Sequence, residues 1–246
     1  DEINKWISDA TKGKIQKMIA PPISQDVLMY LINAIYFKGE WTEQFDKKHT
    51  FSRKFRAGNG ETKKVMMMSR KGEVAYGQGD DFKAVRLPYG NGKTAMYCIL
   101  PDEAASINQF IAGIDGAKWN TIKKSLSQTE DVTVQIPRFK MEYGIKNLND
   151  SLTALGMGEA FHGSADFSGI SGIRDDIFIG NVLHKAMIEV NEEGSEAAGV
   201  TVSEIQKTAI VEPITFIGDR PFVFVIADED TGTVLFVGKL WDVDEK

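Results

Sequence analysis

The segment EEGSEAAGVTV, residues 192–202, decides how this chain is to be understood. At the period of a β-strand, one of its faces carries Ser195, Ala197, Gly199 and Thr201, which are all small. A strand with a uniformly small face fits between two existing strands without a clash or a cavity. The segment also lacks the large apolar side chains that a resident core strand uses. We therefore expect a strand that inserts into a sheet, not one already in place.

Four further segments match a known family together with this one. The 192–202 segment resembles the hinge of the reactive-centre loop in inhibitory serpins, the suicide inhibitors of serine and cysteine proteases. The other matches are LINAIYFKGEW at residues 31–41, VLHKA at residues 182–186, IGDRPFVFVI at residues 217–226 and VLFVGK at residues 234–239. The matches run over essentially the whole chain in the family's order, so the chain is similar to serpins of the inhibitory type.

The resemblance implies an α+β chain with the serpin fold, in which a large mixed β-sheet A and the sheets B and C are flanked by helices. Serpins have a sizeable N-terminal portion ahead of the helix with which this chain begins. Residues 1–246 are therefore expected to be the C-terminal part of a single serpin domain, as a fragment or as one chain of a nicked molecule. The reactive-centre loop is expected at about residues 192–212.

The hydrophobic pattern predicts mainly β-structure with few helices. Residues 107–126 are expected to be helical. Residues 27–37 form a long apolar run, which is typical of a strand buried on both faces. Asn33 in its middle is then a buried amide that needs a hydrogen-bond partner. Residues 177–190 are expected to form a long strand that leads into the hinge, and residues 213–240 to supply three more strands.

The composition is that of an ordinary soluble globular protein. The chain has 42% hydrophobic and 26% charged residues and a formal net charge of -6, which argues against a general nucleic-acid surface. Short basic runs at residues 53–56 and 63–64 are contact candidates, although a solvated strand or turn face explains them more simply. No apolar run approaches the ~20 residues of a membrane helix. We expect neither a nucleic-acid nor a membrane partner.

No motif for catalysis or for cofactor binding is present. The three histidines and the single cysteine lack the spacing of metal ligands. Cys98 lies in an apolar, strand-like run, where a buried thiol acts as a small hydrophobic side chain. The GNGKT run at residues 90–94 lacks the earlier glycine of a phosphate-binding loop. We expect that the protein is not an enzyme and has no cofactor and no metal.

In serpins the target protease attacks the exposed loop and forms an acyl-enzyme, and the cleaved loop then inserts into the main sheet. By this resemblance the hinge consists of Glu192, Glu193, Gly194, Ser195, Glu196, Ala197, Ala198 and Gly199. The inward positions of the segment carry no large, charged or proline residue. This favours an inhibitory member over a non-inhibitory serpin that acts as a carrier, chaperone or storage protein, which is the alternative.

The family's loop register places the reactive bond after Thr208, between Thr208 and Ala209. Thr208 suits proteases with small apolar pockets. The preceding bond, between Lys207 and Thr208, suits trypsin-like enzymes, whose acidic pocket accepts a cation. Ile205 offers elastase-like enzymes a further site, and a solubilising charge on an exposed loop is the simpler interpretation of Lys207. The sequence leaves the bonds after Lys207 and after Thr208 both open.

Several residues outside the small-residue segment match positions that control sheet opening in serpins. Asn33 and His184 match the region where the central strands part, the shutter, and we expect them to form a hydrogen-bonded latch. Trp41 matches a tryptophan near the top of the sheet, where insertion begins, although an ordinary buried aromatic residue explains it equally well. Glu192 matches a carboxylate that pairs with a base on the neighbouring strand, and Arg138 is its expected partner.

The expected function is therefore inhibition of serine proteases, with cysteine proteases as additional targets, by covalent trapping. The expected partner is a trypsin-like or elastase-like protease. We expect a monomer, paired with its own N-terminal fragment if the chain is nicked. The expected location is extracellular, periplasmic or on the cell surface.

Overall fold

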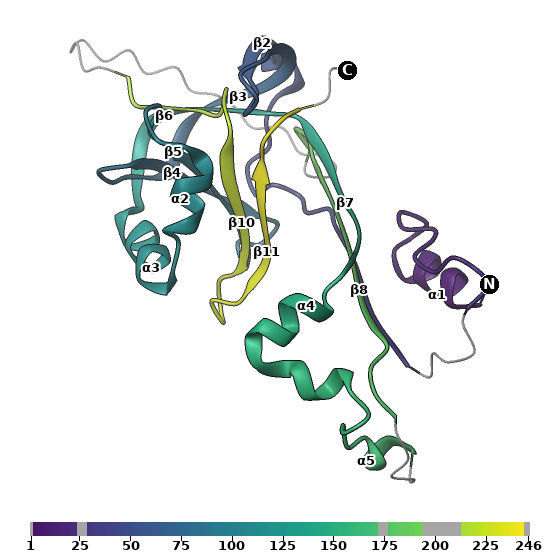
Figure 1. Cartoon of the computed structure of the whole chain (residues 1–246). Coiled ribbons are helices and arrows are strands. Elements are labelled where there is room, and N and C mark those ends of the chain that lie inside the picture. The colour runs from purple at the N-terminus through teal and green to yellow at the C-terminus, as the bar shows by residue number, and fades with distance from the viewer. Residues whose placement is uncertain (1, 24–28, 172–176, 194–212, 244–246) are drawn as a thin grey trace. The chain divides into compact units, whose positions relative to one another are not determined.

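The computed structural model describes residues 2–23, 29–171, 177–193 and 213–243. The chain forms two compact units, each of which is assembled from two separate stretches of sequence. Unit 1 consists of Asp1–Phe37 and Lys140–Glu189, and unit 2 of Lys38–Phe139 and Val190–Lys246. Figure 1 labels most of their helices and strands.

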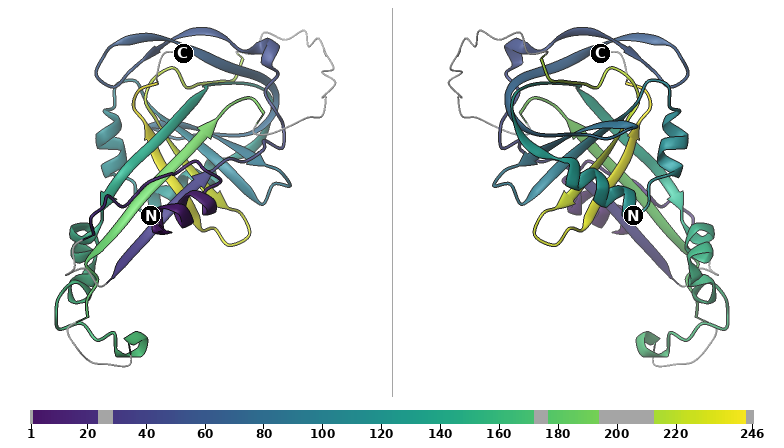
Figure 2. Two further views of the ribbon diagram at one scale, coloured as in Figure 1. Left: turned by 90° about the vertical axis from the view of Figure 1, so that its right-hand side faces the viewer. Right: turned by 90° about the vertical axis from the view of Figure 1, so that its left-hand side faces the viewer.

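Unit 1 is built on a three-stranded sheet with the order β1-β8-β7. Figure 2 shows these strands running side by side. The main elements are α1 (Glu2–Ala10), β1 (Tyr30–Phe37), β7 (Phe139–Asn147) and β8 (Asn181–Val190). Short helical turns connect β7 to β8, namely α4 (Asn149–Leu152), η2 (Thr153–Met157), η3 (Gly158–Phe161) and α5 (Ser168–Ser171).

Helix α1 covers one face of this sheet. Ile7, Ile15 and Met18 form its buried core and pack against Ile32 and Leu183 of β1 and β8. The other face of β1 is more open, because Leu31 and Asn33 are exposed, and β1 is one of the two edge strands of the sheet. The expectation that residues 27–37 are buried on both faces, with Asn33 as a buried amide, is therefore wrong for the described part of this strand.

Unit 2 contains an eight-stranded sheet with the order β11-β10-β5-β4-β3-β6-β9, in which β2 also pairs with β3. Its strands are β2 (Phe51–Arg56), β3 (Thr62–Gln78), β4 (Phe82–Tyr89), β5 (Thr94–Pro101), β6 (Ser127–Pro137), β9 (Thr215–Ile217), β10 (Phe222–Asp228) and β11 (Val234–Leu240). Its helices are η1 (Lys47–His49), α2 (Ile107–Ala112) and α3 (Gly116–Ser125). The three strands expected within residues 213–240 are thus confirmed as β9, β10 and β11.

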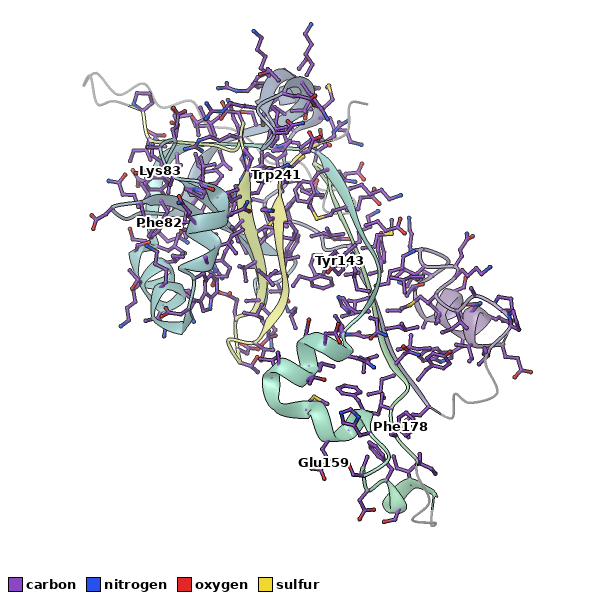
Figure 3. All side chains as sticks on the ribbon, viewed as in Figure 1. Phe82, Lys83, Tyr143, Glu159, Phe178 and Trp241 are labelled. Atoms are coloured by element: carbon purple, nitrogen blue, oxygen red, sulfur yellow. The ribbon has the colours of Figure 1, made fainter. Side chains whose placement is uncertain are left out.

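Helices α2 and α3 pack on the central strands of this sheet (Figure 1). The cluster includes Phe82, labelled in Figure 3, with Phe110 of α2 and Ile122 of α3. The single helix expected over residues 107–126 is in fact two helices. The break is local, because Gly113 caps α2 and the Asp115 side chain accepts a hydrogen bond from Lys118 N (2.7 Å) at the start of α3.

Two features of the core follow directly from residue type. Cys98 is fully buried in β5, and burial raises the pKa of its thiol, which confirms the expectation of an inert side chain. Gly238 of β11 lies against the ring of Phe224 in β10, its cross-strand partner. A Cβ atom at Gly238 would lie 2.2 Å from that ring, so any larger residue there would force the buried ring to move.

Candidate functional site

Most of the predicted loop lies outside the described residues. These undescribed positions include Gly194, Ser195, Glu196, Ala197, Ala198 and Gly199 of the hinge and Lys207, Thr208 and Ala209 of the reactive bond. The two described ends of the loop are Glu193 and Pro213, which both belong to unit 2. The structure therefore shows how the loop is held at its ends, and this anchor is the candidate site.

Glu192 is the centre of the anchor. The residue is only 2% exposed although it is ionisable. Nε of Arg138, just beyond β6, donates to the Glu192 carboxylate, with Oε1 and Oε2 at 2.6 and 2.7 Å, and Nη2 of the same guanidinium lies 2.5 Å from Oε1. The predicted contact between these residues is thus present, in the two-point geometry that makes an arginine–carboxylate pair strong. The Arg138 side chain remains 42% exposed, so one partner is buried and the other is open to solvent.

A third residue also donates a hydrogen bond to this carboxylate. The hydroxyl of Thr50, directly before β2, donates to Glu192 Oε1. Burial by itself would raise the pKa of the Glu192 carboxyl. The hydrogen bonds from Arg138 and Thr50 together outweigh burial and hold its pKa below the ordinary value. Glu192 is therefore held in its charged form at neutral pH.

The backbone on either side of Glu192 is also held. The indole N–H of Trp41 donates to the carbonyl of Asn191 (2.8 Å), and the N–H of Phe45 donates to the carbonyl of Glu192 (3.1 Å). Trp41 is buried and stacks on Tyr89, with ring centroids 4.3 Å apart and planes 12° apart. The segment between β1 and β2 thus fixes, by hydrogen bonds, the backbone that follows β8.

One exposed ion pair extends the anchor to the last described residue before the loop. Lys47 of η1 pairs with Glu193, and this hydrogen bond lowers the pKa of the Glu193 carboxyl. Both side chains reach solvent, at 63% and 37% exposure. Such pairs contribute little to stability. The anchor therefore depends mainly on Glu192 and Trp41.

The far end of the loop enters the sheet of unit 2. Strand β9 pairs in parallel with β6, and Thr133 N donates to the carbonyl of Ile214 (2.9 Å) just before the strand. Beyond β9, Asp219 accepts from Arg53 of β2 (3.1 Å), and its carbonyl accepts from Arg56 N (2.8 Å). The returning chain is thus fixed by β6 and β2.

Asn33 and His184 form a second candidate group, within unit 1. The parallel register of β1 and β8 sets them directly opposite each other. Within the described residues, Nδ1 of His184 is buried without a hydrogen-bond partner, so this nitrogen makes no bond to Asn33. Tyr143 of β7, labelled in Figure 3, places its ring 6.1 Å from that of His184. The register brings the predicted pair together, and its role as a latch stays a prediction.

The sequence did not indicate Thr50 as a member of the anchor, and it indicated Trp41 without its partner. Thr50 lies 142 positions from Glu192, and Trp41 lies 150 positions from Asn191. Neither residue belongs to a local pattern that points to its partner.

Among the described residues, no group of three or more histidine, cysteine, aspartate or glutamate side chains is suited to hold a metal ion. In the same residues, no helix has the length and apolar character needed to cross a membrane.

Comparison with known proteins identifies the family of this chain. A family model described as serpin (serine protease inhibitor) matches residues 1–243. The chain belongs to the serpin family. Among curated relatives, intracellular coagulation inhibitor 2 of Tachypleus tridentatus is 39% identical over 241 residues, which cover 97% of this chain and 58% of that protein. Human leukocyte elastase inhibitor is 36% identical over 248 residues, which cover 96% of this chain and 64% of that protein.

Solved structures agree with this assignment. The native-state structure of tengpin, a thermophilic serpin, superposes with a TM-score of 0.84 at 32% identity and covers 98% of this chain and 62% of that one. Uncleaved ovalbumin has a TM-score of 0.84 at 30% identity, with coverage of 98% and 61%. The predicted α+β serpin fold is thereby confirmed. This serpin chain spans less than two thirds of the length of these relatives.

The comparisons also bear on two other expectations. The family model is described as one of serine protease inhibitors, in agreement with the expectation that the protein is not an enzyme. The expectation of an extracellular, periplasmic or cell-surface protein is wrong, because a relative at 39% identity is named as an intracellular inhibitor. The five segments that indicated the family carry no information about location.

Proposed function

We propose that this chain is the loop-bearing part of an inhibitory serpin that traps serine proteases covalently. Residues 1–246 would form the C-terminal part of one serpin domain, with the reactive-centre loop at about residues 192–212. The protease attacks the loop as a substrate and forms an acyl-enzyme, after which the loop inserts into a sheet and the enzyme stays attached. The observation that carries the proposal is the small-residue hinge, which directly follows the anchored Glu192.

The topology of unit 1 supports insertion next to β8. A strand that follows β8 through a tight turn runs antiparallel to it. Since β1 and β8 are parallel neighbours, such a strand placed between them would be antiparallel to both. Antiparallel pairing is the more stable arrangement per residue. About 10 inserted residues at about 1 kcal/mol per hydrogen bond would release about 10 kcal/mol, which is comparable to the stability of a whole domain.

The target class is proposed from the loop sequence and from the relatives. Lys207 suits a trypsin-like protease, and Thr208 or Ile205 suits an elastase-like one. Several relatives are named leukocyte elastase inhibitors, among them those from human and from Bos taurus. Serine proteases are therefore the primary proposed targets, with cysteine proteases as a second class to be assayed. We take the protein to act as a monomer.

The anchor has a proposed role in this cycle. Glu192, Arg138 and Trp41 hold the chain at the point where insertion starts, so they would keep the uncleaved hinge out of the sheet. Asn33 and His184, opposite each other on β1 and β8, would control the parting of these strands as the shutter. Both roles concern the energy barrier to insertion and not the recognition of the protease.

Thermal unfolding before and after loop cleavage tests the proposal. The full-length protein is nicked once within residues 194–212 by a protease that it does not trap, and the cut is located by mass spectrometry. An inhibitory serpin should become much more heat-stable, because the freed strand inserts. An unchanged midpoint would favour the non-inhibitory alternative, a carrier, chaperone or storage protein.

A further inference from the structure

Three cations on one face of the β2–β3 ribbon have no part in the loop anchor. The antiparallel register sets Lys54 directly opposite Lys64, and Arg56 opposite Thr62. Side chains alternate between the faces of a strand, and directly opposite residues share a face. Lys54, Arg56 and Lys64 therefore project from one face, which is exposed, while Phe55 on the other face is fully buried. We call Lys54, Arg56 and Lys64 the cationic face.

The cationic face has no counter-ion among the residues that the structure describes. Within the described ranges of the chain, none of its three side chains lies within 4.0 Å of a carboxylate. The adjacent cations on the same ribbon are paired, Arg53 with Asp219 and Lys63 with Asp242. Like charges directly opposite in a sheet are destabilising. The three cations of the cationic face thus repel one another, whereas Arg53 and Lys63 of the same ribbon are neutralised by carboxylates.

A neighbouring arginine adds to this positive field. Burial lowers the pKa of the Arg220 guanidinium, and the charge of Arg56 lowers it further, although the carboxylates of Glu103 and Asp219 oppose the shift. In the part of the chain that is placed, Nε and Nη1 of Arg220 are buried without a hydrogen-bond partner. The carboxylate of Glu103 is 4.0 Å away on a side chain that is 79% exposed. Positive charge is therefore concentrated near Arg56 and is incompletely compensated.

The cationic face lies on the same sheet as the strand that leaves the loop. Strand β3 pairs with β6, and β6 pairs with β9. Ser69, Gln135 and Ile217 are in register across these three strands. Measured along β3 and then across two strand spacings, Lys64 is about 20 Å from Ile217. A protease domain of ~200 residues has a radius of gyration of about 16 Å. About 20 Å therefore separates Lys64 from the strand that follows the loop, a span comparable to the radius of a protease domain.

We propose that the cationic face docks an acidic patch on the target protease and accelerates the encounter that precedes loop cleavage. The inference rests on the proposed function, because it assigns a partner surface to the same loop. Complementary charges at the rim of an interface act mainly on the association rate. They are screened by salt over about 10 Å at 0.1 M ionic strength. The cationic face would thus select among proteases with the same cleavage specificity.

The test uses the full-length protein and the triple variant Lys54→Gln, Arg56→Gln and Lys64→Gln. A matched control, Lys17→Gln, Lys83→Gln and Lys124→Gln, removes the same net charge from exposed lysines elsewhere. Association rates are measured with anionic and with cationic trypsin, which share specificity for lysine and arginine. At low ionic strength the triple variant should react about tenfold more slowly with anionic trypsin. The difference should vanish near 1 M salt, and the control should match the parent protein.

Several results would overturn the inference. Equal rates for variant and parent, or an equal loss with the control or with cationic trypsin, would exclude a specific docking surface. If the triple variant kept the parent's association rates and lost only its retention on a heparin column, the cationic face would be a polysaccharide site instead. Rates of loop cleavage are measured alongside complex formation. Absence of a covalent complex from every variant would contradict the proposed function, while the charge effect on the cleavage rate would still test the docking surface.

Discussion

Replacing Arg138 with methionine should destabilise the folded protein through the carboxylate that it leaves behind. Glu192 is 2% exposed and would lose its two-point partner. Removal of one member of a fully buried ion pair costs about 3–5 kcal/mol. Arg138 is 42% exposed, so solvent already screens part of the interaction. Thr50 also remains as a donor. We therefore expect a loss of about 2 kcal/mol in the free energy of unfolding at pH 7.

The effect should depend on pH with a definite sign. In the parent protein the pKa of Glu192 is below its ordinary value, so this group stabilises the fold above the ordinary carboxyl pKa. That contribution is lost as the pH falls through the lowered pKa. Without Arg138, burial dominates and the carboxyl protonates more readily. The difference between variant and parent should thus be largest at neutral pH and should shrink below about pH 4.

Urea unfolding of the full-length proteins, followed by tryptophan fluorescence at several pH values, measures this difference. Lys47→Met is the matched control, because it removes the exposed pair with Glu193 and should leave the midpoint unchanged. Charge reversal, Glu192→Lys, should in addition promote spontaneous loop insertion or polymerisation, visible by size-exclusion chromatography. If Arg138→Met unfolded like Lys47→Met at every pH, the buried pair would not hold the hinge and the reasoning would fail.

Two substitutions and one thiol-reactivity assay test other parts of the account. Gly238→Ala should lower the free energy of unfolding by about 1–3 kcal/mol, because its Cβ would lie 2.2 Å from the ring of Phe224; an unchanged denaturation midpoint would contradict this. His184→Ala should lower the melting temperature and alter inhibition, and unchanged values of both would end the latch hypothesis. The Cys98 thiol, fully buried with a raised pKa, should react with a disulfide reagent at pH 8 only after unfolding; a fast reaction of the native protein would refute its burial.

Much of the fold was predictable because the decisive information is local in sequence. The five segments that indicated the family need no knowledge of contacts, and the small face of residues 192–202 follows from strand period alone. The contact between Arg138 and Glu192 was predicted by the same resemblance. Boundaries were less accurate: a single helix over residues 107–126 ignored the cap chemistry of Gly113 and Asp115.

Other parts depend on contacts that sequence does not display. Thr50 reaches Glu192, and Trp41 reaches Asn191, only through the arrangement of strands. Asn33 was expected to be buried because its neighbours are apolar, yet exposure also depends on its position on the edge strand β1. The pairing of Lys54 with Lys64 likewise required the register of β2 and β3.

Covalent trapping is the central claim, and one gel experiment tests it most directly. The full-length protein is mixed with a trypsin-like protease and, separately, with an elastase-like protease, and the products are separated under denaturing conditions. The account predicts a band that survives denaturation at the summed mass of protease and cleaved inhibitor. Mass spectrometry of the released C-terminal peptide would then distinguish cleavage after Lys207 from cleavage after Thr208. Cleavage of the loop by both proteases without any such band would contradict the account, because the loop would then be a substrate only.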